Sequence, residues 1–527
     1  MLVQTEQVIS RVLQPIRSDL AQRLLALAPA VALLAIALAG FGLRLWQLDV
    51  LGFNSDEAVY AGQAAAIASD PALKEIFPIF RAHPLLFQWV MALTMAFGVE
   101  EVGLRVLSGV IGMLTVWLAF LIGRLLFGQR VGLLAALLMA LMPYHVVVTR
   151  QVLLDGPMTL ASTLALYLVA KFAHTGRPGW LYAAGAAMGL TFLAKETGII
   201  LLGAIYAFLA LAPEVRVRIR DLVISVVMMV LVIAPFPISL ILAGGGGTSK
   251  VSSYLVWQIF RRANHDWIFY PTTVPLAIGL GLVLVATVGL IAVRRWMGWR
   301  EKLLFAWIVV PLLFFQVWPV KGFQYLLPIS VPLAVMASVS MIEVFPATIW
   351  NTVRRDWLRV RVLPAVAILA VTVSLAIGSW SRIQVSTSGE FLAGSGGVPG
   401  GREAGLWVKE NVPVGATLMT IGPSMANILQ FYGHRAAFGL SVSPNPLHRN
   451  PSYDPIENPD FQIRSGEIQY VVWDSFSALR STFFSSRIRE YVTRYHGRVV
   501  HTESIVVTTP EGAPATVPVI VVYEVRP

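Results

Sequence analysis

Residues 26–60 read ALAPAVALLAIALAGFGLRLWQLDVLGFNSDEAVY, and this stretch decides how the chain folds. Its first part, 26–46, is apolar over the roughly 20 residues that a helix needs to cross a bilayer. Its second part leaves the apolar run and carries an acidic pair, Asp56 and Glu57. Ionisable side chains at a membrane are costly and commonly functional. We therefore expect a membrane-spanning helix followed by a site at the membrane surface.

The composition extends this pattern to the whole chain. Of 527 residues, 56% are hydrophobic and 13% are charged. Such a chain is too apolar for one soluble globule and is typical of a polytopic membrane protein. The net charge of +11 requires no nucleic-acid partner, because cytoplasmic loops of membrane proteins carry an excess of Lys and Arg. The absence of cysteine excludes disulfides and thiolate metal sites.

Apolar runs predict eleven membrane spans. They lie near 26–46, 103–123, 131–149, 157–172, 179–194, 197–212, 222–243, 273–293, 303–318, 323–343 and 363–381. The run Pro84–Gly98 is short and suits a re-entrant or interfacial helix better. With that assignment, the N-terminal segment and five loops on its side hold eighteen Lys and Arg residues, against ten in the opposite-side segments that precede the final span. The positive-inside rule then puts the N-terminus in the cytoplasm and Asp56 outside.

The chain divides into four predicted parts. These are an amphipathic cytoplasmic segment, 1–25; a transmembrane domain, 26–381, with a first outer loop, 47–102; a glycine-rich linker, 382–401; and a soluble α/β domain, 402–527. In the last part we expect strands at Ala416–Ile421, Tyr470–Trp473, Ile505–Thr508 and Val519–Val525, and helices at Arg402–Asn411, Met425–Tyr432 and Ser475–Tyr495. Gly433 and Gly497 read as the C-caps of the last two helices. An odd number of spans places this domain outside the cytoplasm, on the side of Asp56.

Charged and polar side chains gather at the predicted outer helix ends. They are Asp56, Glu57, Arg81, His83, Arg105, His145, Arg150, Asp155, Lys195, Glu196, Arg261, Arg262, His265, Asp266 and Lys321. A single cleft on that side would hold acids and bases together. The structural alternatives are an N-cap for Asp56 and Glu57, an ion pair between Arg150 and Asp155, and snorkelling for the cations.

Six motifs occur in an order that resembles a known family. They are Asp56-Glu57, His83-Pro84-Leu85-Leu86, Arg105-Val106-Leu107-Ser108-Gly109, Gly123-Arg124-Leu125-Leu126-Phe127-Gly128, Arg150-Gln151-Val152-Leu153-Leu154-Asp155 and Phe192-Leu193-Ala194-Lys195-Glu196. Together they are similar to the GT-C glycosyltransferases of the protein mannosyltransferase and aminoarabinose transferase type. The resemblance implies an eleven-span core that transfers a sugar from a polyprenyl-phosphate donor to an acceptor on the outer face of the membrane.

The resemblance also implies roles for the charged residues. Asp56 is the general base that takes the proton of the acceptor hydroxyl as it attacks the anomeric carbon, which inverts that carbon. Glu57 orients the acceptor or Asp56. Cations would stabilise the leaving phosphate. The candidates are Arg81, His83, Lys195, Arg261, Arg262 and Lys321.

A second acid, Asp155, would assist donor binding or a divalent metal ion, with Arg150 and Glu196 in orienting positions. Asp56, His83 and Asp155 offer the oxygen and nitrogen ligands that suit such an ion. The chain departs from the family pattern at His83-Pro84-Leu85 and at Gln324-Tyr325.

Three functions compete at this point. The first is a plasma-membrane glycosyltransferase with a polyprenyl-phosphate sugar as donor and a protein, lipid or cell-wall acceptor. The second is a transporter or flippase of lipid-linked sugars, since intramembrane charges also mark translocation paths. The third is a non-catalytic envelope protein whose outer domain binds a partner. The sequence leaves the sugar and the acceptor open.

Overall fold

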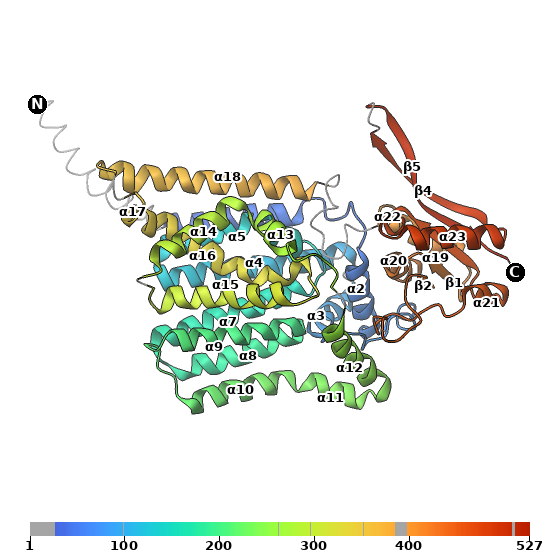
Figure 1. The fold of residues 1–527 in the computed structure, drawn as a ribbon, viewed down its shortest axis with the longest axis horizontal. Helices are drawn as coiled ribbons and strands as arrows, with labels where there is room; N and C mark the ends of the chain where they lie inside the picture. Colours follow the sequence, from blue (N-terminus) through green and yellow to red (C-terminus); the bar gives the residue numbers. More distant parts are fainter. Residues whose placement is uncertain are drawn as a thin grey trace, which may run out of the picture.

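The computed structural model describes residues 27–98, 100–261, 263–295, 297–350, 353–384, 398–508 and 512–526. It has two parts, a helix bundle and a smaller α/β domain packed against one end of the bundle (Figure 1). The predicted N-terminal segment and most of the predicted linker lie outside the described residues.

Most helices of the bundle run roughly along the long axis of the molecule (Figure 1), and two neighbouring pairs are bent, Gln129–Leu141 with Pro143–Thr149 by 59° and Phe269–Ile278 with Leu280–Val293 by 103°. The bundle helices are Leu27–Leu45, α4 (Glu101–Phe127), α5 (Gln129–Leu141), α6 (Pro143–Thr149), α7 (Asp155–Thr175), α8 (Pro178–Ala194), η1 (Glu196–Ile199), α9 (Ile200–Leu211), α10 (Ile219–Ile233), α11 (Pro235–Leu242), α13 (Phe269–Ile278), α14 (Leu280–Val293), α15 (Trp299–Val317), η2 (Phe323–Ile329), α16 (Ser330–Val339), η3 (Ser340–Val344), α17 (Phe345–Ala347), η4 (Leu358–Val362) and α18 (Leu363–Ile383). At the end facing the α/β domain lie α2 (Ser55–Ile67), α3 (Leu86–Met95) and α12 (Gly245–Phe260).

The prediction of a polytopic helical membrane domain is confirmed. Among the described residues, six helices are long and apolar enough to cross a membrane, or eight if two bent pairs each count as one span. These eight coincide with predicted spans. The remaining three predicted spans form α8, η1 with α9, and α15, which lie alongside the others (Figure 1). The count of eleven stays a prediction. The short run Pro84–Gly98 forms α3, which has only 10 residues and lies beside α2 at the end of the bundle.

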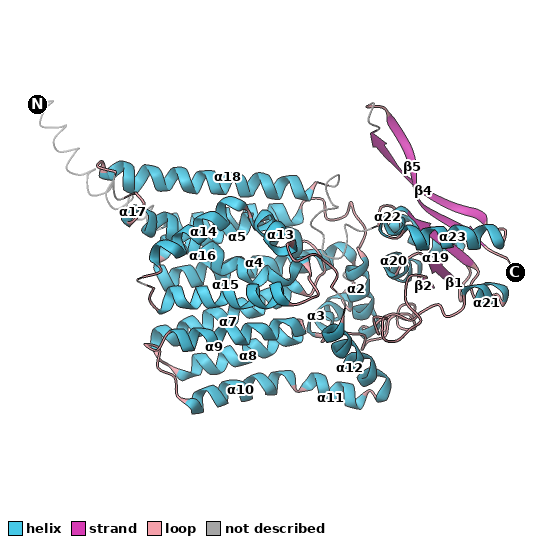
Figure 2. Ribbon diagram, viewed as in Figure 1, coloured by secondary structure: helices cyan, strands magenta, loops and turns pink. Residues whose placement is uncertain are grey.

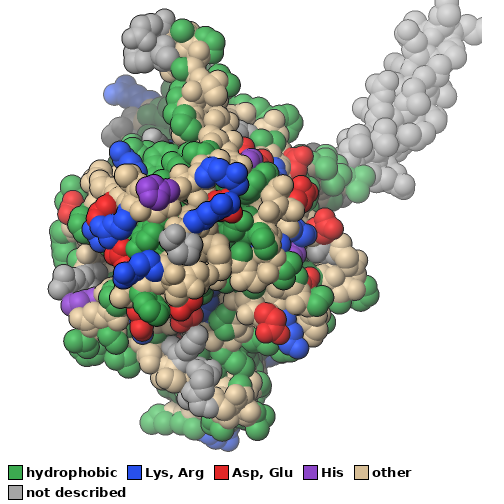
Figure 3. Space-filling model, turned by 90° about the vertical axis from the view of Figure 1, so that its right-hand side faces the viewer, with side chains coloured by type: hydrophobic (Ala, Val, Ile, Leu, Met, Phe, Trp, Pro, Cys, Tyr) green, Lys and Arg blue, Asp and Glu red, His purple; other side chains and the backbone are tan. Residues whose placement is uncertain are grey.

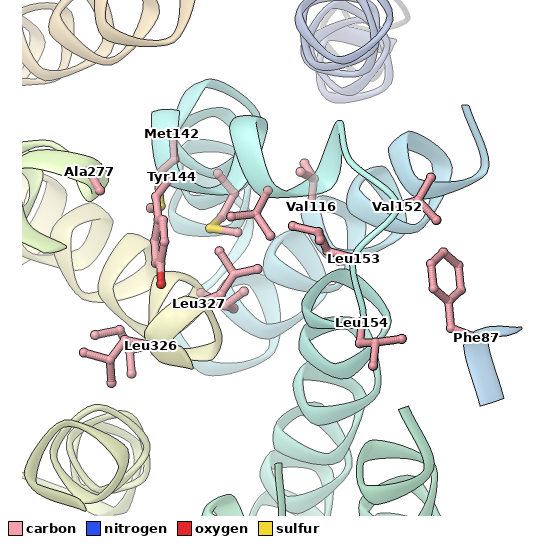
Figure 4. Close-up of a cluster of buried hydrophobic side chains, with 14 of the residues drawn as sticks. Phe87, Val116, Met142, Tyr144, Val152, Leu153, Leu154, Ala277, Leu326 and Leu327 are labelled. Carbon is pink, nitrogen blue, oxygen red and sulfur yellow. The ribbon is translucent and has the colours of Figure 1, made fainter. Parts of the chain in front are cut away.

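Close packing holds the bundle together beneath the site. A Cβ on Gly123 of α4 would lie 2.8 Å from the Cα of Gly132 on α5, so these two helices approach at backbone distance. Figure 4 shows the buried cluster where α3, α4, α6 and η2 meet. Within it, the Tyr144 hydroxyl donates a hydrogen bond to the Phe323 carbonyl. This bond ties α6 to η2, whose first residues reach the site.

Figure 2 shows that the strands are confined to the C-terminal domain. Its elements are α19 (Gly401–Asn411), β1 (Thr417–Thr420), α20 (Pro423–Gly433), β2 (Ala436–Gly439), α21 (Pro459–Arg464), β3 (Tyr470–Asp474), α22 (Ser475–Arg480), α23 (Thr482–Arg494), β4 (Arg498–Thr508) and β5 (Pro514–Glu524). The sheet order is β2-β1-β3-β5-β4. β1 is parallel to β2 and β3, whereas β5 is antiparallel to β3 and β4. The predicted α/β character of this domain is confirmed.

Several local predictions for this domain were wrong. The sequence reading missed β2 and α21, and the predicted helix 475–495 is broken at Ser481. The left-handed residues after the two helices are His434 (φ 51) and His496 (φ 46), in place of the expected glycines. Gly433 serves close packing instead, because a Cβ there would lie 2.9 Å from Val408 Cγ1.

Asp474 makes the stability of this domain depend on pH. The side chain is fully buried at the end of β3, where it accepts a hydrogen bond from Ser477 N, and burial raises its pKa to about 6. A raised carboxyl pKa stabilises the fold when the group is protonated. We expect the domain to lose about 3 kcal/mol of stability as the pH rises from about 4 to 6. Asp474→Asn should flatten this dependence in thermal unfolding, whereas an unchanged profile would contradict it.

Candidate active site at the domain junction

A cavity of about 620 Å³ lies where the bundle meets the C-terminal domain. Its wall is mainly polar and cationic. The lining residues from the bundle and outer loops include Asp56, Tyr60, Gln63, Arg81, His83, Lys195, Tyr254, Gln258, Arg261, Asn264, His265, Lys321, Gln324 and Tyr325, and those from the C-terminal domain are Asn450, Ser452, Tyr453 and Arg480. Asp56 is the one carboxylate on this wall among the described residues.

The start of α2 positions Asp56. Asn54 caps the helix, and its side-chain oxygen accepts hydrogen bonds from the backbone N–H groups of Asp56 (2.9 Å) and Glu57 (3.1 Å). Glu57 completes a capping box by accepting a hydrogen bond from Asn54 N at 3.0 Å. These bonds fix the first turn of α2 and leave the Asp56 side chain on the cavity wall.

Glu57 lies behind this wall and does not line the cavity. Its Oε1 accepts hydrogen bonds from Arg105 Nε and Val152 N, both at 3.0 Å, and its Oε2 accepts one from Arg105 Nη2 at 2.9 Å. The side chain is 1% exposed. The structure therefore gives Glu57 a positioning role for the turn that carries Asp56, and it does not bring Glu57 to a catalytic position.

Burial and the nearby positive charges shift the pKa of Asp56 in opposite directions. Burial raises the pKa of its carboxyl above the ordinary value, and the positive charges of Lys195, His83 and Arg81 oppose that rise. The carboxylate is thus less solvated than a surface aspartate and stronger as a proton acceptor.

Two acid–base pairs flank Asp56, one partly buried and one fully buried. His83 Nδ1 lies 2.8 Å from Glu196 Oε2, and its Nε2 lies 3.5 Å from the Tyr254 hydroxyl. Lys195 Nζ donates to both oxygens of Asp155, at 2.8 and 2.9 Å, and lies 4.9 Å from the Tyr325 ring centroid. His83 and Lys195 line the cavity, whereas their partners Glu196 and Asp155 stand behind them.

The ion pair between Arg150 and Asp155, which was the structural alternative for these residues, is absent from the described residues. Arg150, which follows α6, lies beside the end of the first span. It donates hydrogen bonds to the carbonyls of Leu43 and Trp46, both at 2.6 Å. It does not line the cavity. Arg150 therefore holds the first span in place, and Asp155 pairs with Lys195 instead.

The other four predicted phosphate ligands differ in their placement. Arg81 donates to Ser452 O (3.0 Å) and Asn427 Oδ1 (3.2 Å), so this cavity residue also ties the outer loop to the C-terminal domain. Lys321 lines the cavity and donates to two backbone carbonyls. Arg261 lines the cavity with its guanidinium 4.7 Å from the Trp257 ring centroid. Arg262 lies outside the described residues.

The proposed metal ligands Asp56, His83 and Asp155 do not fit a metal site. His83 Nδ1 faces Glu196, and both Asp155 oxygens contact Lys195. Within the described ranges, no group of three His, Cys, Asp or Glu side chains is arranged to hold a metal ion.

The C-terminal domain completes the site through contacts that the sequence does not reveal. The Tyr432 hydroxyl accepts a hydrogen bond from Phe53 N at 2.7 Å, and Asn427 Nδ2 donates to Ser55 Oγ at 2.9 Å. These bonds bring α20 against the start of α2, so the loop after β2 reaches the cavity. Asn450, Ser452, Tyr453 and Arg480 carry no motif that predicts this placement.

Comparisons with known proteins agree with this arrangement. The chain is similar to ArnT from Cupriavidus metallidurans bound to undecaprenyl phosphate, with a TM-score of 0.66, 15% identity and coverage of 94% of this chain and 98% of that one. It is also similar to the oligosaccharyltransferase AglB from Archaeoglobus fulgidus in complex with an inhibitory peptide and a dolichol-phosphate (TM-score 0.59, 14% identity, coverage of 93% and 74%). A third similar structure is arabinofuranosyltransferase AftD from Mycobacteria (TM-score 0.50, 15% identity, coverage of 96% and 42%).

Curated protein sequences contain no match to this chain. Residues 82–241 match the family described as dolichyl-phosphate-mannose-protein mannosyltransferase. This segment includes His83, Asp155 and Lys195 at the cavity and its second layer. The chain therefore has the GT-C glycosyltransferase fold, and its residues 82–241 carry the sequence pattern of the protein mannosyltransferases.

Proposed function

We propose that this protein is a membrane glycosyltransferase that moves a sugar from a polyprenyl-phosphate donor to an acceptor hydroxyl or amine on the outer face of the plasma membrane. The observation that carries the proposal is the cavity itself. Among the described residues, Asp56 is the one carboxylate on a largely polar wall that also carries five Lys and Arg side chains, at the end of a membrane bundle. ArnT and AglB, which share the fold, have undecaprenyl phosphate and dolichol-phosphate bound.

The reaction follows from these groups. Asp56 accepts the proton of the acceptor as the acceptor oxygen or nitrogen forms a bond to the anomeric carbon. The bond between that carbon and the phosphate oxygen breaks, and its electron pair leaves with the polyprenyl phosphate. Lys195, Arg261 and Lys321 stabilise the charge that gathers on the leaving phosphate. A single displacement inverts the anomeric carbon.

A neighbouring apolar pocket suits the lipid part of the donor. It has a volume of about 200 Å³ and shares Gln258 and Tyr325 with the polar cavity. Its wall is otherwise largely apolar, with Ile200, Phe314, Phe315 and Trp318 among its residues. A phosphate in the polar cavity would leave the polyprenyl chain at this opening.

Ile200→Trp should therefore weaken donor binding. The larger side chain would fill part of the apolar pocket, and the KM for the lipid-linked donor should rise about tenfold, equivalent to about 1.4 kcal/mol. Steady-state kinetics with a detergent-solubilised donor would measure it. Val223→Trp on the exposed face of α10 is the matched control, because Val223 lines neither of the two pockets and is 55% exposed. Equal effects of both changes would remove the pocket from the proposal.

The C-terminal domain should hold the acceptor. Arg480 ends α22 on the cavity wall, and its guanidinium lies 3.8 Å from the Phe476 ring centroid. Arg480→Ala should raise the acceptor KM by about tenfold or more, the loss of one charge-assisted hydrogen bond, and leave the donor KM unchanged. Arg487→Ala on α23, where Arg487 pairs with Glu490, is the control. A larger change in donor KM would place Arg480 with the phosphate ligands instead.

The test of the activity is sugar transfer by the purified protein in liposomes, using a panel of polyprenyl-phosphate sugars. Transfer that depends on Asp56 supports the proposal. Movement of the lipid-linked sugar between leaflets without transfer would replace it with the transporter hypothesis, and binding without either would favour the non-catalytic one.

A further inference from the structure

The hairpin β4–β5 projects beyond the sheet to which it belongs. β3 pairs with residues 520–524 of β5, so residues 514–518 of β5 pair only with β4. The register between β4 and β5 shifts at Glu503 and Ser504, where this free part begins. Such irregularities bend a strand and increase its twist. We call residues 504–508 and 512–518 the hairpin arm.

The hairpin arm exposes apolar side chains on both of its faces. Ile505 and Val517 form a cross-strand pair on one face and are 37% and 40% exposed. Val506, on the opposite face, is 71% exposed. Glu511 is the only charged residue in the sequence from Ser504 to Pro518. The arm is thus an apolar, nearly neutral ribbon on a domain that is otherwise rich in surface charge.

The hairpin arm projects from the protein surface on the side that faces the membrane. In Figure 1 it rises from the C-terminal domain and leans back toward the level of the outer end of α18. Figure 3, which views the molecule from the end of the C-terminal domain, shows it projecting past the rest of the surface, with hydrophobic side chains along it. The arm therefore overhangs the space beside the bundle, where lipid surrounds the helices.

Aromatic residues mark the membrane surface near this place. Trp46, which follows the first span, and Trp380, near the end of α18, have ring centroids 5.1 Å apart and are 42% and 48% exposed. Tryptophans concentrate at the headgroup level of a bilayer. In Figure 1 the arm lies on the same side of the bundle as α18, toward the helix end that carries Trp380.

The β5 edge of the hairpin arm is poorly suited to pairing with another protein strand. Pro514 and Pro518 lack a backbone N–H, which weakens the addition of another strand along β5. A free two-stranded ribbon is marginally stable in water, and its exposed apolar side chains gain free energy when an interface covers them.

We propose that the hairpin arm is a membrane contact, whose apolar side chains enter the headgroup region of the leaflet beside α18. The contact fixes the C-terminal domain over the cavity through the bilayer, in addition to its protein contacts with α2. This inference rests on the shape and polarity of the arm and is independent of the proposed sugar transfer.

Because the natural chain has no cysteine, single-cysteine labelling tests this contact directly. Val506→Cys in the full-length protein, labelled with an environment-sensitive fluorophore, is placed in lipid nanodiscs with and without spin-labelled phosphatidylcholine. The expected result is a blue-shifted emission and loss of intensity when the spin label lies near the headgroups. Val499→Cys, at the base of β4 and 54% exposed, is the matched control and should show neither change.

Two other outcomes would overturn the proposal. An unquenched label at Val506 in nanodiscs would place the arm in water. Disulfide formation between two unlabelled Val506→Cys molecules, with no lipid quenching, would assign the arm to a second copy of the chain. Ile505→Cys repeats the measurement on the opposite face of the hairpin arm. It therefore tests the proposal even if the substitution at Val506 disturbs the arm locally.

Discussion

Replacement of Asp56 by Asn should lower the rate of sugar transfer by about 10²–10⁴-fold, the usual contribution of a general base. The amide keeps the size of the side chain and the hydrogen bonds of the backbone N–H to Asn54, so the first turn of α2 stays capped. What it loses is the ability to take a proton from the acceptor. Initial rates with saturating donor and acceptor would measure the loss in kcat.

The matched control is Asp49→Asn, an exposed aspartate on the same outer loop that does not line the cavity. Its rate should equal that of the unmodified protein. Donor binding by Asp56→Asn should persist, because Asp56 faces the acceptor proton and the cations hold the phosphate. Full turnover by a folded Asp56→Asn protein would exclude Asp56 as the base.

The pH dependence supplies a second readout of the same group. Asp56 works only when ionised, and burial raises its pKa. On acidification, kcat/KM should therefore begin to fall at a pH above the ordinary range of an aspartate. An acid limb at the ordinary position would mean that the cations around Asp56 fully offset the effect of its burial on the pKa.

The sequence located the acidic pair but did not separate its members. Asp56 and Glu57 are adjacent and equally acidic, and either suits a helix N-terminus. Their roles diverge because Arg105, 48 positions away on α4, reaches Glu57 and leaves Asp56 on the cavity wall. Arg105 was itself among the predicted charged residues, yet its partner depends on how α4 packs against the outer loop. Membrane spans, by contrast, follow from local apolar length and were predictable.

The C-terminal domain was harder to predict from the sequence than the membrane spans. Its sheet was predictable in part because β-branched runs mark β3, β4 and β5, whereas the short β2 has the sequence Ala-Ala-Phe-Gly, which carries little strand signal. Its contribution to the site was not predictable. Arg81 meets Ser452 across 371 positions, and such a contact depends on docking between two folded surfaces.

Glu57→Gln should destabilise the membrane domain by about 3–5 kcal/mol, the cost of removing one partner of a buried ion pair. The two oxygens of the native carboxylate both accept hydrogen bonds. Their donors are Arg105, Val152 N and Asn54 N. An amide has one oxygen, so its NH₂ group must face at least one of these donors. Thermal unfolding in detergent would measure the loss, with Glu75→Gln, an exposed acid of the same loop, as the control.

A double change separates this positioning role from a chemical one. If Glu57 acts through Arg105, then Arg105→Met combined with Glu57→Gln should recover part of the stability lost by Glu57→Gln, because the guanidinium is no longer buried without its carboxylate. The recovery should stay partial, because Arg105 also donates to the carbonyls of Leu48, Leu51 and Gly52 and pairs with Glu101. Sugar transfer should fall in Glu57→Gln through displacement of Asp56 and should recover partly in the double variant. A Glu57→Gln protein that kept full stability yet lost as much activity as Asp56→Asn would instead give Glu57 a direct part in the reaction.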